Sequence, residues 1–279
     1  MKKTSSHPQF ELVFFLPLHS FIIRIMLIIE ILNVMGCSMK NEAIHFEKVS
    51  FEVNNKRIIH NFTGTIRKGK ITTLIGPSGA GKTTLLKMCN GLISATAGTI
   101  TINGETIEDI EPTKLRRQIG IALQAAPILK TSVFENLALP RTLHQQTLSK
   151  EEAVRFLKNV GLEEEFLMRD ATALSGGQKQ KLSIARTLVN QSEILLLDEI
   201  TSALDPKSVR EIEELVVHLN ETIGVTIIWI THNIEQARRL GHFTWLLKNG
   251  ALIEASETDT LFQSSNAVVQ QFLKRGDEL

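Results

Sequence analysis

A glycine-rich segment, residues 76–84, has the residue types and spacing that bind phosphate. Its sequence, GPSGAGKTT, fits the pattern G-x4-G-K-[S/T]. Glycines let the backbone turn so that several N–H groups point at one anion. In this pattern Lys82 is expected to neutralise the outer phosphates of a nucleotide, and the Thr83 hydroxyl to bind Mg²⁺. The expected phosphate-binding residues are Gly76, Pro77, Ser78, Gly79, Ala80, Gly81, Lys82, Thr83 and Thr84.

Two carboxylates follow an apolar run farther along the chain. Asp198 and Glu199 directly follow the apolar run, residues 194–197. If this run is a strand, both carboxylates lie at the carboxyl edge of a sheet, where ligands bind in open α/β folds. Asp198 is expected to hold Mg²⁺ through water, which leaves Glu199 to polarise a water molecule aimed at the terminal phosphate. Alone, such a pair is equally compatible with a solvated turn. Together with the phosphate loop it indicates a hydrolytic nucleotide site.

The segments on both sides of the glycines support this interpretation. A β-branched run, residues 71–75, precedes them, and a helical apolar pattern begins at Leu85 and Leu86. With a strand, a phosphate loop and a helix in this order, the helix adds its positive N-terminal end to the site. The alternative, an ordinary glycine-rich turn, requires neither flanking element.

A second candidate anion site lies at residues 174–178, LSGGQ. Ser175, Gly176 and Gly177 open a helix whose apolar residues include Leu182 and Leu188. The free N–H groups and the dipole of this helix would attract an anion. One phosphate loop already holds a nucleotide from one side, so this segment would have to approach the phosphates from another.

With these motifs the chain resembles the ATP-binding cassette (ABC) ATPases. Residues 174–178 are similar to the family's signature motif, and residues 202–205, SALD, are similar to its D-loop. His232, at the end of an apolar strand, stands at the switch-histidine position, and Gln124 stands at the Q-loop position. The motifs occur in family order over about residues 44–273.

The resemblance implies ATP hydrolysis with Mg²⁺ by two cassettes packed head to tail. His232 would hold the γ phosphate and the attacking water beside Glu199, and Gln124 would contact Mg²⁺ or that water. Asp205 would reach across the dimer and couple the two sites. The signature residues that would cover the partner's γ phosphate are Ser175, Gly176, Gly177 and Gln178.

The sequence departs from the family pattern at four positions. Val53 occupies the place of the aromatic residue that stacks on adenine, and the chain has no tyrosine. Adenine is therefore expected to rest on an aliphatic surface or to bind weakly. Ile200 replaces a proline, Lys181 an arginine and Asn233 an aspartate, and none of these changes removes a group that hydrolysis needs.

The element pattern predicts an α/β fold with three parts: a P-loop NTPase core with a parallel sheet, an antiparallel β subdomain, and an inserted helical subdomain at about residues 125–190. Strand-like residues 43–51 and 58–66 flank a turn at Asn54 and Asn55, which predicts the antiparallel part. The parallel strands are expected near Ile71, Ile119, Ile194, Val225 and Phe243, alternating with helices near Lys82, Pro206 and Ile234.

Helices are also expected in the inserted part and at the end of the chain. Residues 133–139 and 150–160 have helical patterns, and the second opens with a capping box from Ser149 to Glu152. Residues 266–274 predict a C-terminal helix.

The composition agrees with one large globular domain. Of the 279 residues, 43% are hydrophobic, and 31 basic residues balance 30 acidic ones. This balance gives nucleic acid no electrostatic reason to bind. Cys37 and Cys89 are the only cysteines and belong to no CxxC motif or histidine cluster, so buried free thiols are expected rather than a disulfide or a zinc site.

Residues 1–38 differ in composition from the rest of the chain. Of the 25 residues 12–36, 18 are apolar, yet an arginine and a glutamate interrupt the run and leave it too short to cross a bilayer comfortably. Three interpretations stay open: an extension outside the working protein, a membrane-associating segment, or a signal or span. We favour the first, with an ABC ATPase domain at residues 39–279 that begins at Met39.

These features predict the ATP-binding and hydrolysing subunit of an ABC transporter, peripheral to the cytoplasmic face of the cell membrane. No later segment is apolar enough to span a membrane, so the resemblance implies a separate integral membrane permease. A second copy in a homodimer and, in some transporters, a substrate-binding protein would be further partners. The alternative is a soluble ABC ATPase in a non-transport assembly such as iron–sulfur cluster biogenesis.

The transported substrate is not specified by this sequence. Ile200 and the segment FENLALP, residues 134–140, are similar to metal-export-type cassettes. The chain length resembles that of phosphate-import cassettes instead. Because substrate choice resides in the membrane subunit, these likenesses leave the substrate and the direction of transport open.

Overall fold

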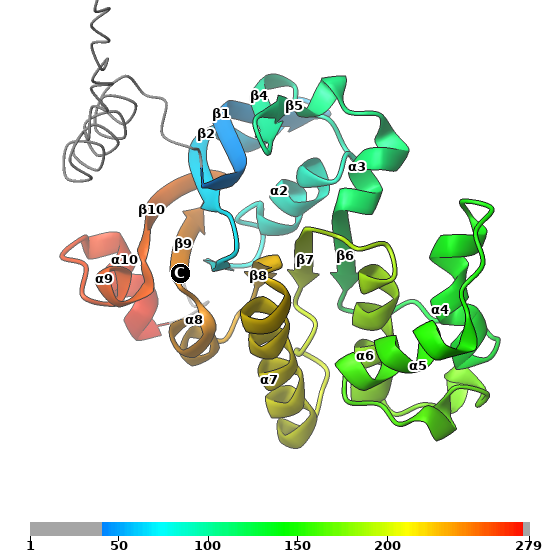
Figure 1. Ribbon diagram of the computed structural model, residues 1–279. Coiled ribbons are helices and arrows are strands. Elements are labelled where there is room, and N and C mark those ends of the chain that lie inside the picture. Colours follow the sequence, from blue (N-terminus) through cyan, green and yellow to red (C-terminus); the bar gives the residue numbers. More distant parts are fainter. Residues whose placement is uncertain (1–40, 276–279) are drawn as a thin grey trace, which may run out of the picture. The chain divides into compact units, whose positions relative to one another are not determined.

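The computed structural model describes residues 41–275 (Figure 1). The predictions for residues 1–38, with Cys37, lie outside this part of the chain. Within residues 41–275, no helix has both the length and the apolar content that a membrane span requires.

The first sheet is antiparallel and has the strand order β2-β1-β4-β5. Its strands are β1 (Glu42–Val53), β2 (Lys56–Arg67), β4 (Ala97–Ile102) and β5 (Glu105–Thr106). Asn54 and Asn55 join β1 to β2, with φ angles of 50° and 58°, as a two-residue hairpin turn requires. Val53 pairs with Lys56 across this turn. The predicted hairpin is confirmed.

The second sheet has six strands in the order β10-β9-β3-β8-β7-β6. They are β3 (Ile71–Ile75), β6 (Ile119–Leu123), β7 (Ile194–Asp198), β8 (Thr226–Ile230), β9 (Phe243–Lys248) and β10 (Ala251–Glu257). All neighbours pair in parallel except β10 with β9. β3 and β8 are buried along their whole length, as expected of strands covered on both faces. Asp198 pairs with Leu123 on one side and Ile230 on the other, so three strands end together at one edge.

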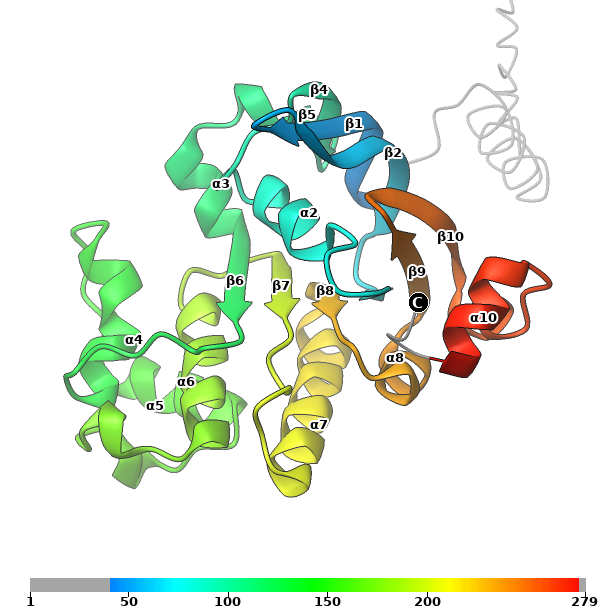
Figure 2. The same cartoon turned by 180° about the vertical axis from the view of Figure 1, so that it is seen from behind.

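Helices cover both faces of this second sheet. They are α2 (Lys82–Cys89), α3 (Pro112–Gln118), α4 (Val133–Thr142), α5 (Lys150–Asn159), α6 (Gly176–Leu188), α7 (Pro206–Ile223), α8 (Ile234–Leu240), α9 (Thr258–Phe262) and α10 (Ala267–Arg275). In both views α4, α5 and α6 lie beyond β6, whereas α9 and α10 lie at the opposite, β10 side (Figures 1 and 2). The predicted three-part α/β fold is therefore confirmed.

Among the described residues, three hydrophobic clusters hold the layers together, and the smallest packs α8, α9 and α10 against β3 and β9. The other two are larger. One lies between the antiparallel sheet, α2 and one face of the second sheet, where the rings of Phe46, Phe62 and Trp245 have centroids 5.4 to 6.2 Å apart. The other joins the opposite face to α4, α5, α6 and α7. Because α6 shares that core with the sheet, the helical subdomain is packed directly onto the strands that carry the carboxylates.

The helices of the inserted part begin where their sequences predict. Ser149 caps α5, and its hydroxyl accepts a hydrogen bond from Glu152 N at 3.1 Å. Reciprocal caps of the same kind open α4 and α6. These caps satisfy N–H groups that the first helical turn leaves without an intrahelical partner. The outer limits of this subdomain, 125 and 190, stay a prediction.

Candidate functional site

The phosphate loop joins β3 to α2 and depends on its glycines. Gly76 has a φ of 143°, and a Cβ atom there would lie 2.0 Å from the carbonyl oxygen of Leu247. Gly81 caps α2 with a φ of 98°, and its Cβ would lie 2.6 Å from Ile59 Cδ1. Both positions therefore exclude any side chain, and this lets the loop curve against β9 and β2.

Lys82 brings a positive charge to this loop. Its side chain is buried, with 5% of the residue exposed, and Nζ donates to the carbonyl oxygens of Gly76 at 2.6 Å and Pro77 at 3.0 Å. A buried ammonium needs such acceptors or an anionic partner. The charge is thus held within the loop, where it can meet a phosphate.

Thr83 and Asp198 meet across the sheet edge. The Thr83 hydroxyl donates to Asp198 Oδ1 at 3.1 Å. Burial raises the pKa of the Asp198 carboxyl and the charge of Glu199 raises it further, whereas the hydrogen bond from Thr83 lowers it. The pair offers the oxygen ligands that Mg²⁺ prefers, and a cation beside it would offset the cost of burying the charge.

Glu199 and His232 form the second close pair. Glu199 follows β7 and His232 follows β8, and Oε1 of the first lies 2.5 Å from Nε2 of the second. Glu199 has a φ of 51°, a conformation that costs a non-glycine residue about 1–3 kcal/mol and clusters at functional sites. Its N–H donates to Ile230 O at 3.1 Å, which ties the strained residue to the end of β8.

Most of these groups border one cavity of about 600 Å³, whereas Gly76, Pro77 and Asp198 are not among the residues that line it. It is lined by Lys56, Arg57, Ile58, His60, Ser78, Gly79, Ala80, Gly81, Lys82, Thr83, Thr84, Glu199, His232 and Asn249. The cavity thus joins most of the phosphate loop to the pair Glu199 and His232. A larger cavity of about 840 Å³ along α7 contains no phosphate-loop residue, so chemistry rather than volume identifies the site.

Sequence reasoning missed the polar side chains that β2 contributes to this cavity. Lys56, Arg57 and His60 line it, whereas Val53, at the expected base-stacking position, is 44% exposed and absent from its lining. The hairpin turn at residues 54 and 55 was the sequence signal for this contribution. It fixes where β2 begins, and residues at the start of β2 line the cavity beside the phosphate loop.

Gln124 lies apart from this cavity. It is exposed in the turn that follows β6, one residue beyond Leu123, which pairs with Asp198. The parallel register therefore places Gln124 at the same edge of the sheet as the carboxylates. Gln124 is not one of the described residues that line the phosphate-loop cavity.

The signature segment and Asp205 also lie away from the phosphate loop. Ser175 caps α6, its hydroxyl accepting from Gln178 N at 3.3 Å, and Asp205 caps α7 by accepting from Lys207 N and Ser208 N at 3.0 Å. Hydrogen bonds, first from the Ser208 side chain, lower the pKa of Asp205. A Cβ atom on Gly177 would lie 2.7 Å from Ser208 Oγ. The two helix starts are therefore neighbours.

Cys89 is buried in α2, as predicted. Burial raises the pKa of its thiol to about 12, and Sγ donates to Leu85 O at 3.2 Å. Since the thiolate is the reactive form of cysteine, this residue fills the core and does no chemistry.

A strand, phosphate loop and helix beside carboxylates at a parallel sheet edge define a P-loop nucleotide-binding protein, and comparison with known proteins gives its family. Residues 59–202 match the family described as ABC transporter. The chain is 45% identical over 220 residues, 78% of this chain and 87% of the relative, to YjkB of Bacillus subtilis (strain 168), which carries the name of an ABC transporter ATP-binding protein.

Solved structures agree. The chain is similar to cbiO1 of Clostridium perfringens, described as part of the ABC transporter complex cbiONQ, with a TM-score of 0.73, 27% identity and coverage of 84% of this chain and 96% of the other. It is also similar to MJ0796 in a dimeric post-hydrolysis state bound to ADP and phosphate, with a TM-score of 0.68, 30% identity and coverage of 77% and 98%. The chain belongs to the ABC transporter family, so the resemblance seen in its motifs is confirmed.

Proposed function

We propose that this chain is the ATP-binding and hydrolysing subunit of an ABC transporter. The contact of 2.5 Å between Glu199 Oε1 and His232 Nε2, at the wall of the phosphate-loop cavity, carries the proposal. A carboxylate and an imidazole so close can hold one water molecule between them and the terminal phosphate. The alternative of a solvated turn gives no reason for this pairing.

In the proposed reaction each group of the cavity has one task. The loop amides and Lys82 bind the β and γ phosphates. Glu199 orients the attacking water and accepts its proton, while His232 donates a hydrogen bond to the γ phosphate. The water oxygen forms a bond to the γ phosphorus, and the bond between the γ phosphorus and the β–γ bridging oxygen breaks. ADP and phosphate are released.

Thr83 and Asp198 are the residues that would hold Mg²⁺. Their oxygen atoms, 3.1 Å apart, suit a hard cation, which would neutralise charge on the phosphates. Gln124, just beyond β6, would complete this part of the site from the same sheet edge.

The residues Ser175, Gly176, Gly177 and Gln178 act on the nucleotide of a second copy. None of them lines the cavity described above, and MJ0796, a similar cassette, forms a dimer. Two copies packed head to tail would place each signature helix start over the other's γ phosphate, and Asp205 beside the boundary. ATP would then hold the dimer together.

The partner in the membrane is proposed to be a separate integral permease, with the subunit at the cytoplasmic face. The similarity to cbiO1, described as part of a transporter complex, supports this reading over a non-transport assembly. Extraction of membranes with mild detergent, followed by identification of the integral protein that copurifies, tests it. Copurification with a soluble assembly alone would favour the alternative.

The variant Glu199→Gln tests the hydrolytic assignment. It keeps the side-chain shape but removes the base, so ATP binding should persist, hydrolysis should fall by about 10²-fold or more, and an ATP-bound dimer should accumulate. Nucleotide binding, phosphate release and size-exclusion chromatography with ATP measure the three effects. Wild-type turnover by this variant would contradict the role of Glu199.

A further inference from the structure

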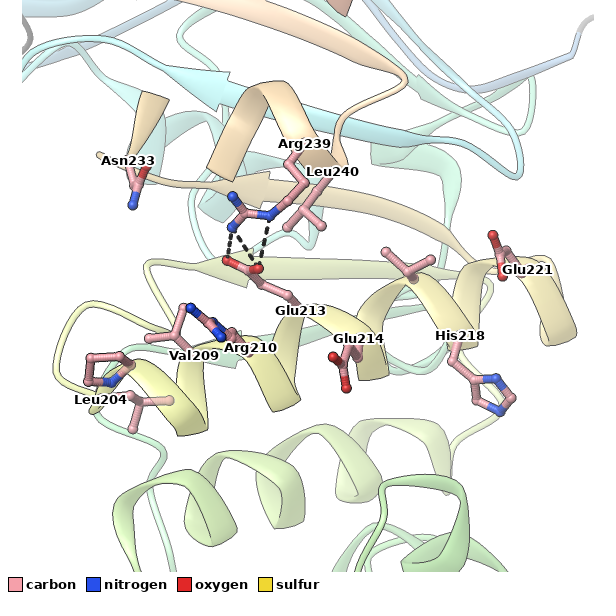
Figure 3. Close-up of a pocket in the computed structure, with 12 residues that line it drawn as sticks. Leu204, Val209, Arg210, Glu213, Glu214, His218, Glu221, Asn233, Arg239 and Leu240 are labelled. Carbon is pink, nitrogen blue, oxygen red and sulfur yellow. Dashed lines mark hydrogen bonds and ion pairs between the residues drawn. The ribbon is translucent and has the colours of Figure 1, made fainter. Parts of the chain in front are cut away.

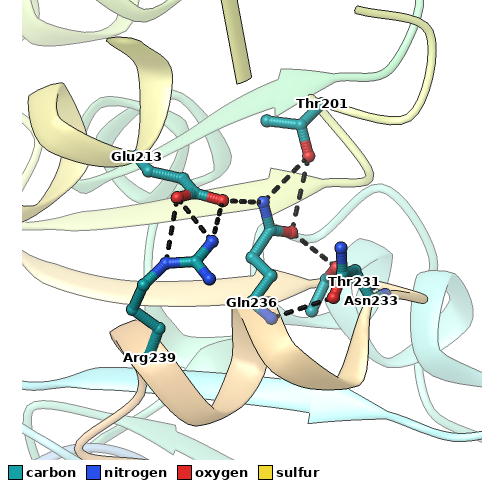
Figure 4. Close-up of polar contacts among 6 residues, drawn as sticks. All are labelled: Thr201, Glu213, Thr231, Asn233, Gln236 and Arg239. Carbon is teal, nitrogen blue, oxygen red and sulfur yellow. Dashed lines mark hydrogen bonds and ion pairs between the residues drawn. The ribbon is translucent and has the colours of Figure 1, made fainter. Parts of the chain in front are cut away.

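The side chains of Thr201, Glu213, Thr231 and neighbouring polar residues form a hydrogen-bonded cluster (Figure 4). At its centre is Gln236 of α8, of which 1% is exposed. Its Oε1 accepts from the Thr231 hydroxyl at 2.5 Å, and its Nε2 donates to Thr201 Oγ1 at 3.3 Å and to Glu213 Oε1 at 2.8 Å. One amide thus connects three different segments of the chain.

Two of the residues that contact Gln236 lie within two positions of the hydrolytic pair in the sequence. Thr231 precedes His232, and Thr201 follows Glu199 by two residues. All of them line one cavity of about 470 Å³, together with Gln236. Moving Gln236 would therefore move both supporting segments.

The third contact belongs to an ion pair between the buried Glu213 and Arg239, whose side chain is 56% exposed. Glu213 of α7 is 5% exposed, and Arg239 of α8 donates to both of its carboxylate oxygens, at 2.6 and 2.7 Å from Nη2 and 3.2 Å from Nε (Figure 3). A buried carboxylate stays charged only when it is paired and hydrogen-bonded. The ion pair therefore fixes the position of Glu213, which in turn fixes the Gln236 amide.

We propose that Gln236, anchored by Glu213 and Arg239, is a positioning residue that sets the distance between Glu199 and His232. The inference rests on the hydrolytic roles proposed above. Glu199 is held in a strained backbone conformation, which persists only where surrounding contacts determine it. Through Thr201 and Thr231, Gln236 holds the segment that follows Glu199 and the residue before His232. Because α7 begins at Pro206, just after Asp205, the cluster also connects the pair to the predicted dimer boundary.

The variant Gln236→Met tests the proposal. Methionine has a similar volume but forms none of the three hydrogen bonds, so kcat for ATP should fall about 10- to 100-fold, the range expected for misplaced reacting groups. The KM for ATP should stay within about twofold, since the phosphate loop is untouched. Gln270→Met on α10, which removes a hydrogen bond to Ser264 O, is the matched control and should leave kcat unchanged.

An exchange variant separates positioning from general stability. Gln236→Glu alone sets two carboxylates against each other and should lower kcat, whereas the double variant Gln236→Glu with Glu213→Gln restores one amide and one carboxylate and should recover part of it. All rates are measured well below the Tm of each variant. If Gln236→Met does not fold, Thr231→Val removes one hydroxyl and should show a smaller fall in kcat at the same KM.

Three results would overturn the inference: a kcat for Gln236→Met equal to that of the wild type, a change in KM alone, or no recovery in the exchange variant. A wild-type protein without ATPase activity would overturn the proposed function as well. The two failures are therefore distinguishable.

Discussion

The phosphate loop and the signature segment are both glycine-containing helix starts, yet they lie in different surroundings. Residues 78–84 of the phosphate loop border a cavity that their own chain completes with Glu199 and His232. Residues 175–178 cap α6 with their own side chains and pack against the start of α7. The difference supports the proposal that one chain builds only one side of a nucleotide site and carries the other side for a second copy.

Mixing two inactive variants is the most direct test of whether two copies of the chain share one nucleotide site. Lys82→Ala removes the loop charge and should abolish both binding and hydrolysis, and Ser175→Arg should block the signature surface, each with a loss of about 10²-fold or more. In a head-to-tail dimer of one copy of each, both defects fall in the same site and the other site is intact. An equal mixture should therefore recover about a quarter of wild-type activity.

The control for this experiment is each variant mixed with itself. If the mixture stays as inactive as its components although mixed dimers form, the nucleotide site is built within one chain and the proposed division is wrong.

The variant Asp198→Asn should have opposite effects on activity and on stability. Without the carboxylate charge that would help to hold Mg²⁺, activity with Mg²⁺ should fall by about 10²-fold. Burial raises the pKa of Asp198, so the stability contributed by its protonated form is complete below the ordinary pKa of 3.8 and is lost as the pH rises through the raised value. Asparagine does not ionise, so the variant does not lose this stability as the pH rises.

Thermal unfolding of the nucleotide-free proteins measures the second effect. The Tm of Asp198→Asn should exceed that of the wild type, and the difference should grow as the pH rises above 3.8. In a domain of this size about 1 kcal/mol shifts Tm by about 2–4 °C. A Tm below that of the wild type at neutral pH would show that Asp198 is stabilising.

Val53→Tyr should improve binding of the adenine base, for which the sequence offers no aromatic residue at this position. A base stacked on an aromatic ring gains about 1–3 kcal/mol, and Val53 is 44% exposed beside the turn into β2, so the KM for ATP should fall about fivefold or more. Ile223→Tyr, at an exposed position on α7, is the control. An unchanged KM would mean that the base does not reach residue 53.

Protein that begins at Met39 should show the smallest effect. Every residue assigned to the site lies within residues 41–275, so the truncated protein should be soluble and should hydrolyse ATP at the wild-type rate. Soluble yield and kcat measure this. Loss of folding or activity would show that residues 1–38 belong to the working domain.

Local chemistry made several features predictable. The turn at Asn54 and Asn55 follows from the tolerance of asparagine for positive φ, and the Ser149 cap from a hydroxyl three residues before Glu152. Asp198 and Glu199 were expected at the sheet edge because an apolar strand precedes them. Each of these signals lies within a few residues of the feature it predicts.

Features that join distant segments could not be predicted in this way. Gln236 has no distinctive neighbours in the sequence, and its role depends on Thr201 and Glu213, which lie 35 and 23 residues away. Arg57 and His60 reach the phosphate cavity only because β2 packs beside the loop at Gly81. Gln124 was expected in the site. It lies at the same sheet edge as the carboxylates, because Leu123 pairs with Asp198, but it is exposed and does not line the cavity.

The sequence by itself determined which groups are available: a phosphate loop, a carboxylate pair, a signature helix start and the order that relates them. Backbone conformation and capping depend on nearby residues, so these parts can be read from short segments. The tertiary structure decided which groups meet. Parallel strands from separate parts of the chain bring Thr83 to Asp198 and Glu199 to His232. The same arrangement leaves the signature segment outside the phosphate-loop cavity.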